Sequence, residues 1–246
     1  MYKNYVFDLY GTLVDIHTDE EIDSLWEKLS IFFASYNAKY TPNELKEEYK
    51  KFCKEEKEKV QKKHKVTHGE IKVEAVFQRL FNEKSVEVST QELLCVAKFF
   101  RLLSMEYIKL YDGALELLDS LKAKGKKIIL LSNAQRSFTE SELKFLDLYD
   151  RFDKIYISSD YNCCKPDINF YQIMLKELNL NPKETIMIGN DEITDIKGSF
   201  EAGLDSLYIH SNISPEIKGE LLSKFTIMDG DVKSILPKIC KWINYY

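Results

Sequence analysis

The pattern of hydrophobic and polar positions divides the chain into three parts. Residues 5–8 form a short strand-like run, and a helical pattern extends from about residue 16 to 106. From about residue 110 to 211, short apolar runs alternate with helical stretches. Strands that alternate with helices imply right-handed crossovers and a mainly parallel sheet. The pattern therefore predicts an α/β fold with helices on both faces of the sheet, plus a helical unit inserted after the first strand.

Six short apolar runs are the predicted strands of this sheet. Continuous apolar runs of this length are typical of strands that are buried on both faces. The strands cover residues 5–8, 127–132, 154–159, 185–189 and 206–210, with 225–228 as an outer strand. The helices expected between them cover residues 113–124, 137–146, 168–179 and 192–202. Gly125 and Gly203 follow two of these helices, as is usual for glycine at the end of a helix.

Start signals divide the helical unit into four helices. Thr18, with Glu21 three residues later, predicts a capping box at the start of the first helix. The Thr-Pro pair at 41–42 predicts the start of the second, because proline is favoured in the first helical turn. Apolar residues at helical spacing within 73–81 predict the third helix. A Ser-x-x-Glu signal starts the fourth, which we expect to cover 89–107.

Composition and charge narrow the class of protein. Of the 246 residues, 44% are hydrophobic and 13% aromatic, which is enough to form a buried core. The 40 acidic residues outnumber the 35 Lys and Arg residues, and the net charge of −5 attracts neither nucleic acid nor anionic membranes. The 5 cysteines lack the spacing of a disulfide framework and indicate free thiols. We therefore expect a cytoplasmic protein with no signal peptide or membrane segment.

Polar residues follow four of the predicted strands. Asp8 ends the first strand, and the pair at 132–133, Ser132-Asn133, ends the second. Lys165 lies in the loop after the third, and Asp191 and Asp195 follow the fourth. The carboxyl ends of parallel strands meet at one edge of a sheet, so these side chains should share a crevice. Their chemistry suits attack on an anionic centre, with a divalent cation neutralising the charge.

Four motifs at these strand ends resemble, in this order, those of the haloacid dehalogenase-like hydrolase superfamily. They are FDLYGTLVD at 7–15, LLSNA at 130–134, KPD at 165–167 and IGNDEITDIKG at 188–198. The resemblance extends from residue 5 to about 210. It implies a Rossmann-like core domain of residues 1–15 and 107–246, and a helical cap domain of residues 16–106.

The resemblance also assigns roles to individual residues. Asp8 would be the nucleophile and would form a covalent aspartyl intermediate. Ser132 and Asn133 would bind the anionic oxygens of the substrate, and Lys165 would offset the charge between Asp8 and the substrate. Thr12 of the first motif belongs to the same catalytic group.

Mg²⁺ is the cofactor that the resemblance implies. Its expected ligands are Asp8, the backbone carbonyl of Tyr10, Asp191 and Asp195. Mg²⁺ prefers hard oxygen ligands and usually takes few protein carboxylates. The sequence leaves open which of Asn190, Asp191 and Asp195 binds the metal directly.

Tyr10 departs from the phosphatase pattern of this superfamily. The phosphatases carry a second Asp two residues after the nucleophile, where it acts as general acid and base. The metal-free dehalogenases carry Tyr there, since a halide leaving group needs no proton. Tyr171, six residues after Lys165, also matches a dehalogenase position. Tyr10 stays among the catalytic candidates, and the two tyrosines favour a dehalogenase.

The acids after the fourth strand point to a phosphatase. The dehalogenases have neutral residues there before a single Asp, whereas this chain has Asp191 and Asp195, which would repel Asp8 without a cation. The first two cap helices also lack the arginine that holds the substrate carboxylate in dehalogenases. We therefore favour a Mg²⁺-dependent phosphatase that acts on a small phosphorylated metabolite as a monomer or homodimer. The alternatives are a metal-free 2-haloacid dehalogenase and a weakly active phosphometabolite-binding protein.

Overall fold

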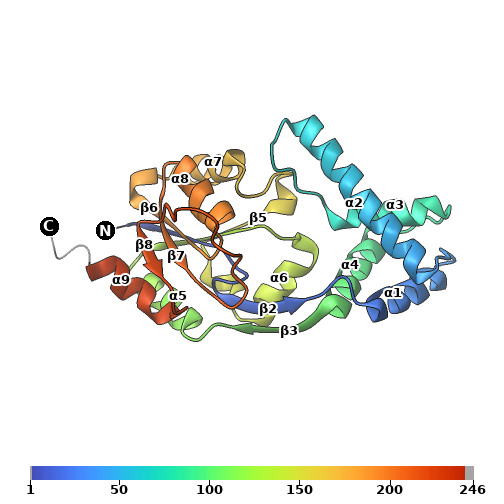
Figure 1. The fold of residues 1–246 in the computed structure, drawn as a ribbon, viewed down its shortest axis with the longest axis horizontal. Coiled ribbons are helices and arrows are strands. Elements are labelled where there is room, and N and C mark those ends of the chain that lie inside the picture. Colours follow the sequence, from blue (N-terminus) through green and yellow to red (C-terminus); the bar gives the residue numbers. More distant parts are fainter. Residues whose placement is uncertain (1, 242–246) are drawn as a thin grey trace.

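A six-stranded parallel sheet forms the centre of the larger lobe of the molecule (Figure 1). The structure is a computed structural model that describes residues 2–241. In spatial order the strands are β5 (Lys154–Ile157), β4 (Lys127–Ser132), β1 (Asn4–Phe7), β6 (Thr185–Gly189), β7 (Asp205–Ile209) and β8 (Phe225–Ile227). β1 pairs with both β4 and β6, so the chain order reverses between β1 and β6. In doubly wound sheets, ligands bind at this reversal, outside the carboxyl ends of the strands.

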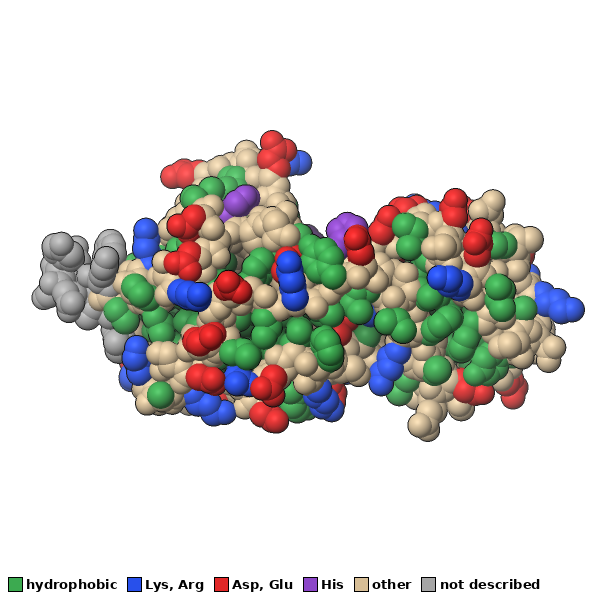
Figure 2. Space-filling model, turned by 90° about the horizontal axis from the view of Figure 1, so that it is seen from below, with side chains coloured by type: hydrophobic (Ala, Val, Ile, Leu, Met, Phe, Trp, Pro, Cys, Tyr) green, Lys and Arg blue, Asp and Glu red, His purple; other side chains and the backbone are tan. Residues whose placement is uncertain are grey.

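A helical insertion forms the second, smaller lobe (Figure 1). Its helices are α1 (Asp23–Ser35), α2 (Pro42–His64), α3 (Val73–Glu83) and α4 (Thr90–Ser104). They have a hydrophobic core of their own, which includes Trp26, Phe33, Phe77 and Phe100. The insertion joins the sheet through β2 (Val14–Thr18) and β3 (Met105–Leu110), which pair as an antiparallel ribbon. Figure 2 shows a narrower waist between the two lobes, with acidic and basic side chains interspersed on the visible face.

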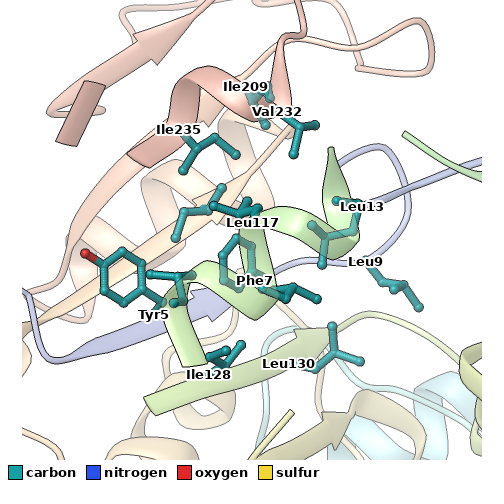
Figure 3. Close-up of a cluster of buried hydrophobic side chains, with 14 of the residues drawn as sticks. Tyr5, Phe7, Leu9, Leu13, Leu117, Ile128, Leu130, Ile209, Val232 and Ile235 are labelled. Atoms are coloured by element: carbon teal, nitrogen blue, oxygen red, sulfur yellow. The ribbon is translucent and has the colours of Figure 1, made fainter. Parts of the chain in front are cut away.

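Helices cover both faces of the sheet, as the alternating pattern predicts. Side chains of a strand point alternately to opposite faces. Tyr5 and Phe7 of β1 therefore pack on one face with α5 (Ala114–Ala123) and α9 (Ile235–Lys241) (Figure 3). Val6 packs on the other face with Phe170 of α7 (Ile168–Glu177). Within residues 2–241, no helix is both long and apolar enough to cross a membrane.

Most elements predicted from the sequence are confirmed. All six strands are present, although β5 stops at Ile157 because residues 158–160 form a 3₁₀ turn. The predicted starts of α2 and α4 are capping boxes, in which Thr41 and Ser89 each exchange hydrogen bonds with a Glu three residues later. The helix expected at 137–146 is α6 (Arg136–Phe145).

Two predictions at the base of the insertion are wrong. Thr18 is the last residue of β2, and α1 begins at Asp23 with no side-chain cap. The fourth helix ends at Ser104, because Met105 pairs with Thr18 in the β2–β3 ribbon. This pairing satisfies the backbone groups of both segments and overrides the local helix signals. The predicted domain boundaries, after residues 15 and 106, fall within the two strands of the ribbon and stay a prediction.

The helix expected for residues 192–202 is split in two. Glu192–Lys197 form a π-helical turn, and α8 (Gly198–Glu201) follows it directly. π-helical turns are rare and occur frequently at functional sites. This turn carries the acids that follow β6.

Candidate active site

Lys165 lies at the centre of the polar cluster at the carboxyl ends of β1 and β6. Its Nζ is 2.7 Å from Asp8 Oδ1 and 2.7 Å from Asp195 Oδ1. Asp8 follows β1 directly, Asp195 lies on the π-helical turn after β6, and Lys165 lies in the loop before α7. The sheet thus brings together three residues that are far apart in the sequence, as the strand-end rule predicts.

The charges of this cluster depend on one another. Burial lowers the pKa of Lys165, but the neighbouring Asp195 and Asp8 outweigh burial, so the pKa is raised and Lys165 stays cationic. Burial raises the pKa of Asp195, and Lys165 opposes this shift. The pKa of Asp195 is raised to about 7, so Lys165 favours the ionised carboxylate but only partly offsets the effect of burial.

The backbone after β6 binds the second oxygen of Asp195. The backbone N–H groups of Asn190 and Asp191 both donate to Asp195 Oδ2, at 3.1 and 3.0 Å. Asp191 in turn caps the π-helical turn, and its Oδ1 accepts from the N–H groups of Ile193 and Thr194. Aspartate is favoured at this position because it satisfies N–H groups that have no partner within the helix.

Two carboxylates of the cluster keep an oxygen available for a metal ion. Among residues 2–241, no hydrogen bond engages Oδ2 of Asp8 or Oδ2 of Asp191, whereas both oxygens of Asp195 are engaged. The described residues contain no group of three acidic, His or Cys side chains arranged to hold a metal. Mg²⁺ commonly takes one or two carboxylates and retains several waters. Asp8 and Asp191, with the Tyr10 carbonyl, fit that requirement.

A pocket of about 240 Å³ opens at this cluster. Its lining residues are Asp8, Tyr10, Asn133, Lys165, Asn190, Asp191, Thr194, Asp195, Ile213 and Pro215. Six of them are residues that the sequence predicts for the site. Ile213 and Pro215 come from the connection between β7 and β8, which carries none of the four motifs and no sequence signal that points to the site.

The remaining predicted residues are buried near the strand ends but do not all face the pocket. Ser132 is fully buried, and its hydroxyl has no partner among residues 2–241. Asn133 is hydrogen-bonded to the loop before α7. Its side-chain oxygen accepts from Lys165 N–H at 2.8 Å, and its side-chain nitrogen donates to the Lys165 carbonyl at 2.8 Å. The hydroxyl of Thr12 donates to Asn190 Oδ1 at 3.4 Å. Thr12 and Ser132 are not among the residues that line the pocket.

Tyr10 points toward a charged pair that joins the two lobes. Its hydroxyl donates to Glu142 of α6 and lies 3.1 Å from the hydroxyl of Thr139. Glu142 also accepts from Arg101 of α4 at 2.6 Å, and the Arg101 guanidinium lies over the Tyr10 ring. Burial, followed by the charge of Glu142, raises the pKa of Tyr10, so the phenol stays protonated. No local sequence pattern links Arg101 and Glu142 to the site, so the sequence alone does not predict their contact with Tyr10.

Hydrogen bonds to Asp167 hold the connection between α2 and α3 against the core. Asp167 Oδ2 accepts from the backbone N–H groups of Thr67 and His68, at 2.7 and 3.1 Å, and from the Thr67 hydroxyl at 2.9 Å. Its Oδ1 accepts from Asn169 N–H at 2.9 Å. Asp167 thus caps α7 and also joins the insertion to the core through its hydrogen bonds with Thr67 and His68.

Asp167→Asn is expected to weaken these hydrogen bonds in a pH-dependent manner. Burial raises the pKa of Asp167, but the hydrogen bonds from Asn169, His68 and Thr67 outweigh burial, so the pKa is lowered. The carboxylate therefore stabilises the fold above its ordinary pKa of 3.8, and this contribution is lost as the pH falls through the folded value. We expect the variant to lose about 1–3 kcal/mol at pH 7.

Denaturant unfolding of both proteins between pH 7 and pH 2 measures the effect. The difference in unfolding free energy between the native protein and Asp167→Asn should be constant near neutral pH. It should become smaller below the ordinary pKa of Asp167. Asp150→Asn, at an exposed position, is the control and should show no such difference. A difference at pH 7 that persists unchanged at pH 2 would rule out the charge of Asp167 as its source.

Comparisons with known proteins give one family and two kinds of activity. The sequence model of the family described as haloacid dehalogenase-like hydrolase matches residues 2–203. Pyrimidine 5'-nucleotidase PynA of Streptococcus pneumoniae is 26% identical over 249 residues, which cover 97% of this chain and 98% of the relative.

Two solved structures show the same fold. The 2-haloacid dehalogenase of Pseudomonas syringae pv. Tomato has a TM-score of 0.67 at 17% identity, with coverage of 98% of this chain and 100% of that chain. The HAD-hydrolase YfnB of Bacillus subtilis, bound to magnesium, has a TM-score of 0.56 at 21% identity, with coverage of 96% and 97%. At these identities the likeness concerns the fold and leaves the reaction open.

Proposed function

Because the chain belongs to the haloacid dehalogenase-like hydrolase family, we propose that it is a Mg²⁺-dependent phosphatase acting on a small phosphorylated molecule. The observation that carries the proposal is the charge of the pocket. Asp8, Asp191 and Asp195 line it with three carboxylates, and among residues 2–241 Lys165 is the one cation that lines it. A like-charge pair ~4 Å apart costs about 4 kcal/mol at an effective dielectric of ~20. A dianionic phosphate would therefore need a divalent cation beside it.

In the proposed reaction, a carboxylate oxygen of Asp8 attacks the phosphorus of the ester, the P–O bond to the leaving group breaks, and the leaving oxygen takes a proton from water. Water then hydrolyses the aspartyl phosphate and regenerates the Asp8 carboxylate. Lys165, held between Asp8 and Asp195, offsets the charge of Asp8 and of the phosphoryl oxygens. Ser132 lies behind the pocket lining, and its buried hydroxyl has no hydrogen-bond partner among residues 2–241, so it is the proposed donor to a phosphoryl oxygen that reaches it.

Mg²⁺ would neutralise charge on the phosphoryl group, held by Oδ2 of Asp8, Oδ2 of Asp191 and the carbonyl of Tyr10. Asp195, whose oxygens are engaged, positions Lys165 and the backbone after β6 in this scheme. The magnesium bound to YfnB of Bacillus subtilis supports the choice of metal. The nucleotidase activity of the Streptococcus pneumoniae relative supports a phosphate ester as substrate.

We also propose that the two lobes are a cap domain and a core domain, and that the protein is cytoplasmic. Residues 16–106 act as a cap over the core of residues 1–15 and 107–246, and the hydrogen bonds to Asp167 and the Arg101–Glu142 pair hold the cap in place. All 5 cysteines are free, as a reducing cytoplasm allows.

A metal-free 2-haloacid dehalogenase is the second candidate, and Tyr10 favours it. Two observations weigh against it. Tyr171, which also matches the dehalogenases, is fully buried and donates to the backbone carbonyl of Thr194 at 2.6 Å, outside the pocket lining. Every arginine of the chain is already paired with a carboxylate, which leaves none to hold a substrate carboxylate. The pairs are Arg79–Glu55, Arg101–Glu142, Arg136–Asp160 and Arg151–Asp119.

Titration of Mg²⁺ into the protein by calorimetry tests the proposal. We expect binding that weakens by at least about tenfold in Asp191→Asn, because the variant loses a charged ligand. Phosphate release from phosphate esters should stop in EDTA and return with Mg²⁺. Glu192→Gln, an acid beside Asp191 that binds the N–H of Lys218, is the matched control and should bind Mg²⁺ like the native protein.

The same assays distinguish the other two candidates. Halide release from a 2-haloacid that is insensitive to EDTA would identify a dehalogenase. Mg²⁺-dependent binding of phosphate esters without any release of phosphate would identify a binding protein.

A further inference from the structure

We infer that the leaving group of the substrate is small and carries no negative charge, and that Ile213 and Pro215 form the wall against which it packs. This inference rests on the proposed phosphatase function and specifies its substrate. It assigns a specificity role to a segment of the core, residues 210–224 between β7 and β8.

The wall is the apolar part of an otherwise polar pocket. Apart from Tyr10, Ile213 and Pro215, all lining residues are acidic, amide, hydroxyl or ammonium side chains. None of the lining residues belongs to the insertion of residues 16–106. The phosphoryl group occupies the polar end, at Asp8 and Lys165, so the carbon skeleton of the leaving group is left to contact the apolar side chains.

The wall is anchored to the site. Ser214, which lies between its two residues, accepts a hydrogen bond from Asn190 Nδ2 at 3.3 Å and from Ser211 N–H at 2.9 Å. Ile213 packs against the hydrophobic core of the sheet. Farther along, Lys218 N–H donates to Glu192 on the π-helical turn at 2.7 Å. These contacts hold the segment beside the carboxylates that follow β6.

Charge excludes a second anionic group on the substrate. Lys165 is the one cation of the pocket lining and already lies between Asp8 and Asp195. Arg101, on the insertion, is paired with Glu142. In the proposed reaction Lys165 and Mg²⁺ would both face the phosphoryl group. A carboxylate on the leaving group would therefore lie beside the carboxylates of the pocket with no further cation among the described lining residues, which is a repulsive basis for selectivity.

Size limits the leaving group as well. The pocket volume of about 240 Å³ is below the ~300–1,000 Å³ that is typical of pockets for drug-sized ligands. The phosphoryl group takes part of this space. The remainder admits a short alcohol or polyol.

Two esters of equal carbon number, glycerol 3-phosphate and 3-phosphoglycerate, test the inference, because they differ in a hydroxymethyl group and a carboxylate. With Mg²⁺ present, we expect kcat/KM to favour glycerol 3-phosphate by at least about tenfold. The Kd values of the two esters, measured by calorimetry on Asp8→Asn, should show the same preference without turnover.

Variants at Pro215 test whether the wall is the source of the substrate preference. Pro215→Arg places a cation at an exposed position of the wall and should lower the preference by about tenfold or reverse it. Pro215→Gln, of similar length without the charge, should keep the preference. Leu222→Arg adds the same charge to the same segment outside the pocket lining and should also keep it.

The outcomes separate this inference from the proposed function. Equal Kd values for the two esters, absence of glycerol 3-phosphate binding, or an unchanged preference in Pro215→Arg would overturn the inference. A clear Kd preference for glycerol 3-phosphate, without phosphate release from any ester, would support the neutral wall and count against the phosphatase.

Discussion

Asp8→Asn is expected to lower turnover by about 10⁴-fold or more, because it removes the nucleophilic carboxylate of the proposed reaction. The fold should survive, since Lys165 keeps its contact with Asp195 at 2.7 Å when Asp8 becomes neutral. We expect the unfolding free energy to fall by no more than about 2 kcal/mol, the contribution of one charged hydrogen bond. Steady-state phosphate release and denaturant unfolding measure the two effects.

Asp15→Asn is the matched control, because Asp15 is another buried acid of the same motif that lies outside the pocket lining. It accepts hydrogen bonds from Tyr107 and Asn212, so the variant perturbs stability without removing the nucleophile. Turnover near the native level in Asp8→Asn, with the fold intact, would show that Asp8 is not the nucleophile.

Lys165→Met is expected to destabilise the fold by about 3–5 kcal/mol, the usual cost of removing one partner from a buried ion pair. Asp8 and Asp195 would then face each other without the ammonium between them. Since burial already raises the pKa of Asp195, loss of Lys165 should raise it further and make Asp195 take up a proton near neutral pH. Catalysis should also fall, by about 10²-fold or more, through loss of the charge facing the phosphoryl group.

A double-mutant cycle with Asp195→Asn separates the charge from the packing of Lys165. Lys165→Met leaves two carboxylates without the ammonium, and Asp195→Asn removes one of these two charges, so the double variant should be more stable than the sum of the two losses predicts. Additive losses would contradict the coupling that the geometry implies. Lys165→Met should also become more stable as the pH falls, because protonation of Asp195 removes the buried negative charge.

The core architecture follows from local patterns. Apolar runs such as 127–132 and 185–189 are short, hydrophobic on both faces and separated by helices, and chains of this type form parallel sheets. The sequence pattern does not identify the β2–β3 ribbon, because its strands are short and its stability comes from pairing between segments at opposite ends of the insertion. Tertiary pairing therefore overrides the capping signal at Thr18 and ends the fourth helix at Ser104, before the expected end at residue 107.

The polar centre of the site could also be anticipated. Asp8, Lys165, Asp191 and Asp195 each follow a strand of one parallel sheet, so the topology alone places them at a common edge. Asn133 was expected at the substrate, but its hydrogen bonds with the Lys165 backbone depend on the path of a loop that no local pattern specifies.

Sequence patterns thus sufficed for the strands, the helices and the edge at which the charged residues gather, because these depend on the period and order of residues along the chain. The partners of the charged residues depend on contacts between distant segments. Tyr10 meets Glu142 and Arg101 from three separate elements, and Ile213 reaches the pocket from a segment without a motif. Such contacts arise from packing in three dimensions, where residues with no periodic relation become neighbours.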